Sequence, residues 1–216
     1  MLRKFSLFFM LFAVIFTSMG TTAFAATSKP SITSKAYYVI DYASGAILTG
    51  GNSNTSLPLA SLSKLMTAYI VMEKISQGKL HWSDKVTVSK QAQAINESEI
   101  KLVAGEKITV KELMIGMMVQ SANDAAYALA EKVSGSERSF ATLMNQTAKQ
   151  LGLTKTTFYT SNGLVYKSSN GKVYTNTMSA RDIAILSRTI LAKHPEILTF
   201  STIKTHTFHP GTSRQM

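Results

Sequence analysis

The segment from Leu59 to about Gly78 constrains the fold more than any other part of this 216-residue chain. If the segment is helical, apolar residues cover most of its sides: Leu65, Met66, Tyr69, Ile70, Met72 and Ile75. A helix that is apolar on most of its circumference is typical of the interior of a domain. We therefore expect a buried central helix around which the rest of the chain packs.

Ser61 and Lys64 stand three residues apart at the start of this helix, and this spacing puts their side chains on one face. A serine hydroxyl needs a neighbouring base to act as a nucleophile, and a lysine can serve if its pKa falls below about 10.4. The backbone N–H of Ser61, at a helix N-terminus, is suited to hold a developing oxyanion. The pair could therefore supply the nucleophile, the base and an oxyanion donor of a catalytic centre.

A plainer interpretation is that Ser61 caps the helix and that Lys64 is a solvated charge. The spacing alone does not distinguish a catalytic pair from a helix cap with a solvated lysine, because the same spacing recurs in four further pairs: Ser76/Lys79, Ser98/Lys101, Ser169/Lys172 and Ser201/Lys204. The apolar surroundings distinguish Ser61 and Lys64 from the other pairs, since a lysine on this helix is not simply exposed to solvent.

Residues 1–25 are typical of a secretory signal peptide rather than of the fold. Arg3 and Lys4 precede an apolar run that is too short to span a bilayer, and Ala23-Phe24-Ala25 gives a small-residue cleavage site. The alternative is an uncleaved anchor. Export implies an oxidising compartment, but the chain has no cysteine, so it relies on an ordinary core without disulfides.

The formal net charge is +11, and removal of Arg3 and Lys4 with the signal peptide leaves a net charge of +9. This excess suggests attraction to anionic envelope polymers or lipid head groups. The basic residues are dispersed and lack interleaved aromatics, so we predict no nucleic-acid partner. The four histidines lack a paired helical spacing, and we predict neither a metal site nor a cofactor: His81, His194, His206 and His209.

The order of predicted elements indicates an α+β fold. Residues 36–41 and 46–49 are rich in β-formers around a turn and predict a hairpin, and residues 85–88 predict a short strand. Helices are expected from Thr109, over 123–133, over 136–151 and from Ser179, with caps at Thr109 and at Ser179. Residues 156–176 are expected to be a loop, and residues 198–208 to be extended or mixed.

Ser121-Ala122-Asn123 lies where one expected helix hands over to the next. The serine hydroxyl can relay a proton, and the asparagine amide can both donate to and accept from a substrate amide. Serine and asparagine are also common helix caps, and Ser168-Ser169-Asn170 has the same short pattern. The three residues alone therefore leave both interpretations open.

Taken together, these motifs carry a resemblance. Residues 58–67 around Ser61, residues 119–126 around Ser121, the run 105–113 and the Ser161-Asn162-Gly163-Leu164 segment look like the serine D-alanyl-D-alanine carboxypeptidases. These low-molecular-mass penicillin-binding proteins form the peptidase S11 family and trim peptidoglycan stem peptides. The resemblance covers nearly all of residues 26–216, with the motifs in the family's order.

The resemblance implies a serine β-lactamase / D,D-peptidase-like fold, with an antiparallel sheet and a helical subdomain at about 81–176 within a catalytic domain of residues 26–216. It implies that Ser61 is the nucleophile that forms an acyl-ester, Lys64 the general base, Ser121 a proton relay and Asn123 a substrate-binding residue. The implied partners are stem peptides ending in D-Ala-D-Ala and β-lactam antibiotics that acylate Ser61. The implied location is exported and extracytoplasmic.

One departure from the family pattern concerns its third motif, Lys-Thr-Gly, which is absent from this chain. The nearest segments, Lys155-Thr156-Thr157 and Lys204-Thr205-His206, lack the glycine that lets a strand approach closely. We therefore expect a C-terminally truncated domain with the last strands missing, and with them any anchor that brings the full-length parent to a membrane surface. On this view residues 26–216 alone have no carboxypeptidase turnover.

Two alternatives remain open from the sequence. A class A-like β-lactamase shares the Ser61 and Lys64 chemistry, but it needs a deacylating glutamate, for which no convincing loop follows Asn123. The second alternative is a non-catalytic peptidoglycan-binding fragment, and the absence of the Lys-Thr-Gly motif is the reason to consider it.

Overall fold

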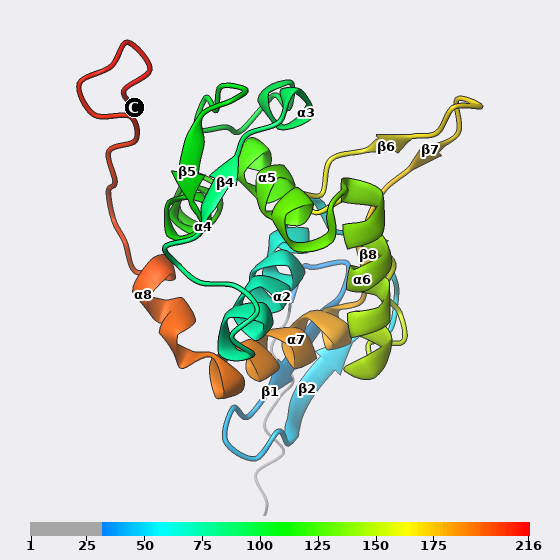
Figure 1. The fold of residues 1–216 in the computed structure, drawn as a ribbon. Coiled ribbons are helices and arrows are strands. Elements are labelled where there is room, and N and C mark those ends of the chain that lie inside the picture. The colour runs from blue at the N-terminus through cyan, green and yellow to red at the C-terminus, as the bar shows by residue number, and fades with distance from the viewer. Residues whose placement is uncertain (1–31) are drawn as a thin grey trace, which may run out of the picture. The chain divides into compact units, whose positions relative to one another are not determined.

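The computed structural model describes residues 32–216, and the signal peptide predicted for residues 1–25 lies outside this range (Figure 1). At the centre of the described fold is helix α2, Lys64–Ser76. Met66, Ala68 and Val71 on this helix are completely buried. The prediction of a buried central helix is therefore confirmed.

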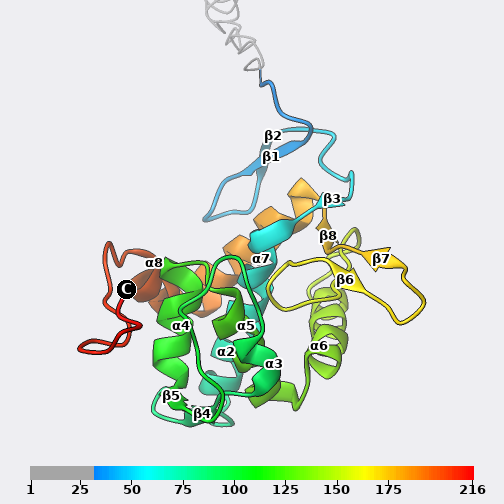
Figure 2. The same cartoon turned by 90° about the horizontal axis from the view of Figure 1, so that it is seen from above.

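Four further helices pack against α2, as Figure 2 shows from above. Their bounds are α4 Val110–Val119, α5 Asn123–Ser134, α6 Glu137–Gln150 and α7 Ala180–Lys193. Helix α7 also contacts strand β1, so α7 links the N-terminal hairpin to the helices. The core is thus built mainly from helices that surround the one carrying Lys64.

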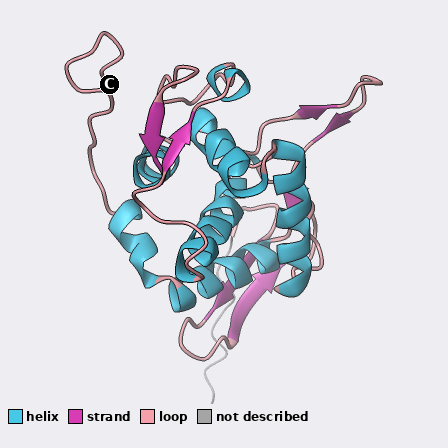
Figure 3. Ribbon diagram, in the orientation of Figure 1, coloured by secondary structure: helices cyan, strands magenta, loops and turns pink. Residues whose placement is uncertain are grey.

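The strands of the described residues form four separate antiparallel pairs (Figure 3). The predicted hairpin is present as β1 Tyr37–Ile40 with β2 Ile47–Gly51, with a register shift at Val39/Ile40. The other pairs are β3 Leu57–Pro58 with β8 Thr177–Met178, β4 Lys85–Thr87 with β5 Lys107–Thr109, and β6 Tyr166–Lys167 with β7 Val173–Tyr174. The antiparallel pairing agrees with the prediction, but each sheet has only two strands.

The predicted caps at Thr109 and Ser179 are present, and Ser136 caps a third helix. The side chains of Thr109, Ser136 and Ser179 each accept a hydrogen bond from the backbone N–H three residues later. Gly135 ends α5 in the left-handed conformation that glycine adopts without strain. These four helix boundaries depend on local chemistry, so the sequence predicts them well.

Other segments differ from the prediction. The helix expected from Leu59 begins as a 3-10 turn, η1 Ala60–Ser63, before α2. The expected loop 156–176 contains the β6–β7 hairpin, which extends away from the helices in Figure 1. The short helices were not predicted: α3 Lys90–Gln93, η2 Pro195–Ile197 and α8 Leu198–Ser201. Within residues 32–216, no helix combines the length and hydropathy that a membrane span requires.

Candidate active site

The candidate nucleophile lies in the 3-10 turn, where Ser61 is exposed to solvent. Ala60 adopts a left-handed φ of 47° and so turns the chain sharply before Ser61. Ser63 stabilises the turn by donating from Oγ to the Ala60 carbonyl at 2.7 Å, and Asn176 Nδ2 donates to Ser63 Oγ at 2.8 Å. The turn thus exposes Ser61 at the surface, while the hydrogen bonds of Ser63 and Asn176 hold its backbone in place.

Lys64, the first residue of α2, is buried below Ser61 with 4% of its surface exposed. Its Nζ has four oxygen neighbours: Ser61 Oγ at 3.1 Å, Ser121 Oγ at 3.4 Å, Asn123 Oδ1 at 2.7 Å and the Asn162 carbonyl at 3.0 Å. The structure therefore brings all four predicted site residues, Ser61, Lys64, Ser121 and Asn123, around one amine.

The hydrogen-bond partners of Lys64 suit a neutral amine. Asn123 Oδ1 and the Asn162 carbonyl can only accept, so they take the two N–H groups of the neutral form. The two serine hydroxyls are the other neighbours of Nζ, and a hydroxyl can donate to the lone pair of a neutral amine. Burial lowers the pKa of Lys64 to about 8, because an ammonium loses hydration there and no carboxylate compensates for the loss. A fraction of the amine is therefore unprotonated near neutral pH, and this fraction can take a proton from Ser61.

Ser121 and Asn123 lie between α4 and α5, at the turn predicted from the sequence. Ser121 has a left-handed φ of 55°, which directs the chain from one helix into the next. The Asn123 backbone N–H donates to the Ser98 carbonyl at 2.6 Å, and its Nδ2 donates to the Asn96 carbonyl at 3.3 Å. These contacts orient the Asn123 amide with its oxygen toward Lys64.

The segment Ser161–Gly163 forms another wall of the site. Thr67 Oγ1, from α2, donates to the Ser161 carbonyl at 2.7 Å, next to the Asn162 carbonyl that accepts from Lys64. Gly163 has a φ of 90°, and a Cβ there would lie 2.0 Å from the Ala60 carbonyl oxygen. Only glycine permits this approach. This segment entered the sequence analysis only through the resemblance, and the contact of its backbone carbonyl with Lys64 was missed.

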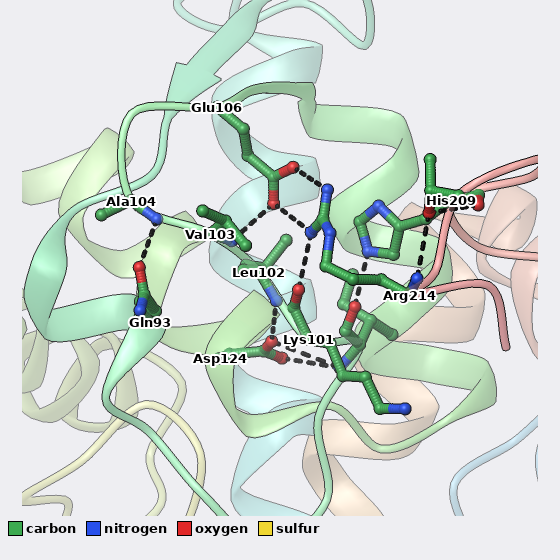
Figure 4. Close-up of polar contacts among 11 residues, drawn as sticks. Gln93, Lys101, Leu102, Val103, Ala104, Glu106, Asp124, His209 and Arg214 are labelled. Carbon is green, nitrogen blue, oxygen red and sulfur yellow. Dashed lines mark hydrogen bonds and ion pairs between the residues drawn. The ribbon is translucent and has the colours of Figure 1, made fainter.

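Two carboxylates outside the cluster hold two chain segments near Lys64, one with Ile100 and Leu102 and the other with Ser161. Asp124, in the first turn of α5, accepts from the Ile100 and Leu102 backbone N–H groups, as Figure 4 shows for the 101–106 region. Glu137, the first residue of α6, accepts from the Ser161 backbone N–H at 2.6 Å and from Ser161 Oγ at 3.0 Å. Neither carboxylate was selected from the sequence.

A groove of about 920 Å³ opens beside the cluster, between α6 and the β6–β7 hairpin. Its lining includes Asn162, Glu137 and the tyrosines Tyr159, Tyr166 and Tyr174. The Tyr174 ring packs, tilted, between the other two, with its centroid 4.8 Å from that of Tyr159 and 6.1 Å from that of Tyr166. Of the residues in hydrogen-bond contact with Lys64, Asn162 also lines this groove.

The other Ser-x-x-Lys pairs do not form sites of this kind. Within residues 32–216, Ser61 and Lys64 are the only such pair joined by a side-chain hydrogen bond; Ser76 and Ser98, for example, donate to backbone carbonyls. Lys155 and Lys204, the lysines of the segments closest to Lys-Thr-Gly, are exposed and lie outside any strand. Neither contacts the cluster through a hydrogen bond in the described structure.

The histidines of the described residues have structural partners. His206 Nε2 contacts Glu112 at 2.8 Å, His194 Nε2 contacts Glu73 at 2.7 Å, and His209 Nε2 donates to the Ile100 carbonyl at 2.6 Å. No group of three or more metal-ligating side chains gathers within residues 32–216. The hydrogen bond between the buried Lys64 amine and Ser61 Oγ suits acyl transfer to a serine with a lysine as base.

Comparison with protein families gives a match to the D-alanyl-D-alanine carboxypeptidase family over residues 23–216. Among curated proteins, the chain is 40% identical over 197 residues to D-alanyl-D-alanine carboxypeptidase DacC of Escherichia coli, covering 87% of this chain and 48% of the relative. It is 36% identical to DacF of Bacillus subtilis, covering 89% and 49%. The chain thus spans about half the length of these relatives.

Solved structures show the same likeness. Penicillin-binding protein 5 from Haemophilus influenzae superposes with a TM-score of 0.76 at 37% identity, over 84% of this chain and 52% of that one. Penicillin-binding protein D2 from Listeria monocytogenes, solved in an ampicillin-bound form, superposes with a TM-score of 0.72 at 30% identity, over 86% and 72%. The predicted α+β fold of the serine β-lactamase / D,D-peptidase type is thereby confirmed.

Proposed function

Because the chain belongs to the D-alanyl-D-alanine carboxypeptidase family, we propose that it carries the acylation centre of a serine carboxypeptidase. This enzyme removes the terminal D-alanine from peptidoglycan stem peptides that end in D-Ala-D-Ala. The observation that carries the proposal is the buried Lys64 amine, which faces the hydroxyls of both Ser61 and Ser121.

In the proposed mechanism, neutral Lys64 accepts the Ser61 proton as Ser61 Oγ attacks the carbonyl between the two D-alanines. Ser121, 3.4 Å from Lys64 Nζ, then passes a proton to the departing D-alanine nitrogen. Asn123 binds the substrate amide in addition to orienting Lys64. Water hydrolyses the acyl-ester on Ser61 and releases the shortened peptide.

The same centre is proposed to react with β-lactams, whose strained amide Ser61 opens to form a stable acyl-ester. The location proposed for the protein is exported and extracytoplasmic, where peptidoglycan lies; the signal peptide predicted for residues 1–25 supports this. The net positive charge of the chain suits an anionic envelope. A β-lactamase is the weaker candidate, since the named relatives are carboxypeptidases.

The test is covalent labelling by a fluorescent penicillin, with hydrolysis of a D-Ala-D-Ala peptide measured in the full-length parent, since residues 26–216 alone are expected to lack turnover. Ser61→Ala is expected to abolish labelling, whereas the matched control Ser76→Ala, in an exposed Ser-x-x-Lys pair, keeps it. Lys64→Arg is expected to be inactive although it keeps the charge, because a guanidinium stays protonated. Labelling that persists in Ser61→Ala or in Lys64→Arg would contradict these roles.

A further inference from the structure

Glu137 has a contact pattern that the acylation chemistry does not require. Its Oε1 accepts from both the backbone N–H and the Oγ of Ser161, at 2.6 and 3.0 Å. Its Oε2 is buried and has no hydrogen-bond partner in the described structure. A buried carboxylate with one unsatisfied oxygen destabilises a fold, so a purely structural role does not explain why the charge is there.

Ser161 connects this carboxylate to the catalytic lysine over a very short path. The Ser161 carbonyl accepts from Thr67 Oγ1, and the next carbonyl along the chain, that of Asn162, accepts from Lys64 Nζ at 3.0 Å. Ser161 is completely buried and Asn162 nearly so. A shift of Ser161 away from Glu137 therefore moves an acceptor of the Lys64 amine.

The ionised and neutral forms of Glu137 differ in how firmly they hold Ser161. Burial raises the pKa of Glu137 to about 7, the Ser161 hydrogen bonds oppose this rise, and the negative charge of Glu131 adds to it. Tyr127 on α5 also interacts with the Glu137 charge, and Arg138 and Lys167 line the same groove as Glu137. Hydrogen bonds to a carboxylate are about twice as strong as those to a neutral acceptor.

We propose that Glu137 is a positioning residue for acylation, whose carboxylate holds Ser161 so that the Asn162 carbonyl keeps the Lys64 amine directed at Ser61. This inference rests on the proposed roles of Ser61 and Lys64. It assigns to Glu137 no contact with substrate. The ionised form positions the lysine better than the protonated form.

The first test needs no turnover and follows NMR resonances from about pH 5 to about pH 9. The Ser161 amide proton is expected to shift with a midpoint near the Glu137 pKa, and the Lys64 Cε resonance is expected to show a small step at the same pH. Both changes should vanish in Glu137→Gln. In the control Glu131→Gln, which removes only a neighbouring charge, the midpoint should move to lower pH. Unchanged Ser161 and Lys64 titrations in Glu137→Gln would overturn the inference.

The second test measures the rate of acylation by penicillin. Glu137→Gln keeps the acceptor and loses the charge, so we expect wild-type rates below about pH 6 and a loss of about threefold to tenfold above about pH 7.5. The Glu131→Gln rate should stay near wild type. A uniform loss at every pH would overturn the inference in favour of a structural role. If the wild type is not labelled at all, the proposed function fails, while the NMR test still decides whether Glu137 controls the lysine environment.

Discussion

The segments on either side of Lys64 are both held by a carboxylate from the first turn of a helix, but in different ways. Asp124 uses both oxygens and accepts from three backbone N–H groups, those of Ile100, Leu102 and its own neighbour Ala125. Glu137 uses one oxygen and holds a single residue, Ser161. Each carboxylate is therefore a link between a helix start and a distant segment.

This difference separates a structural link from an adjustable one. Burial raises the pKa of Asp124, but three amide hydrogen bonds oppose the rise and leave none of its oxygens without a partner. Glu137 has fewer partners, and its pKa reaches about 7. The segment with Ile100 and Leu102, which Asp124 holds, is thus fixed. The segment that carries the Asn162 carbonyl instead responds to protonation of Glu137 in the physiological pH range.

The largest expected effect comes from removing the structural link. Asp124→Ala leaves the Ile100 and Leu102 amides without an acceptor in the interior, and we expect a loss of about 3–5 kcal/mol in the free energy of unfolding. Urea denaturation measures it, with the exposed Glu196→Ala as control. If Glu137→Ala costs more than Asp124→Ala, the contrast between the two links is wrong.

A second prediction displaces the adjustable segment without touching Glu137. In Gly163→Ala the new Cβ would lie 2.0 Å from the Ala60 oxygen, so the segment or the Ser61 turn must move. Because misplacement of a catalytic group by about 1 Å costs roughly 100-fold, we expect penicillin acylation to fall by about that factor. Gly171→Ala is the matched control, since its φ is also positive but its Cβ meets only open space. Similar rates in both variants would show that the contact is unimportant.

The third prediction concerns the pH dependence of stability. The pKa of Glu137 is raised in the folded state from the ordinary 4.5 to about 7, so its stabilising contribution is present below about pH 4.5 and is lost as the pH rises to about 7. Glu137→Gln does not titrate and should be more stable than wild type above about pH 7, by about 3 kcal/mol. Urea denaturation at several pH values measures the difference. A constant difference across this range would contradict the assigned titration.

The smallest expected effect concerns the outer contacts of the Asp124 side. Arg214 pairs with both oxygens of Glu106 and donates to the Lys101 carbonyl, beyond the amides that Asp124 holds (Figure 4). Both side chains are partly exposed, so Arg214→Gln should cost only about 0.5–1 kcal/mol, and less at high salt. Thermal unfolding at two salt concentrations measures this. A loss comparable to that of Asp124→Ala would mean that the segment depends on its outer contacts.

The sequence predicted those features that local chemistry determines. Thr109, Ser136 and Ser179 cap helices because a hydroxyl three residues ahead of a free N–H suffices, and the apolar pattern of α2 requires burial wherever it occurs. The four candidate site residues also met as expected. Their roles as nucleophile, base, relay and substrate-binding residue remain predictions.

The remaining features depend on contacts between distant residues, and local patterns do not contain them. The Asn162 acceptor is a backbone carbonyl, which every residue possesses, and it lies 98 residues from Lys64. Glu137 was one acidic residue at a helix start among several, and its partner Ser161 is 24 residues away. The division of the strands into four pairs likewise depends on which residues meet after folding.

The close approach of Gly163 to Ala60 has a consequence for protein engineering. About a hundred positions separate the two residues, yet the absence of one methyl group lets their backbones touch. The Ser61 turn and the Ser161–Gly163 segment therefore behave as one transplantable module. A loop exchanged between relatives to alter substrate choice has to bring a compatible turn with it.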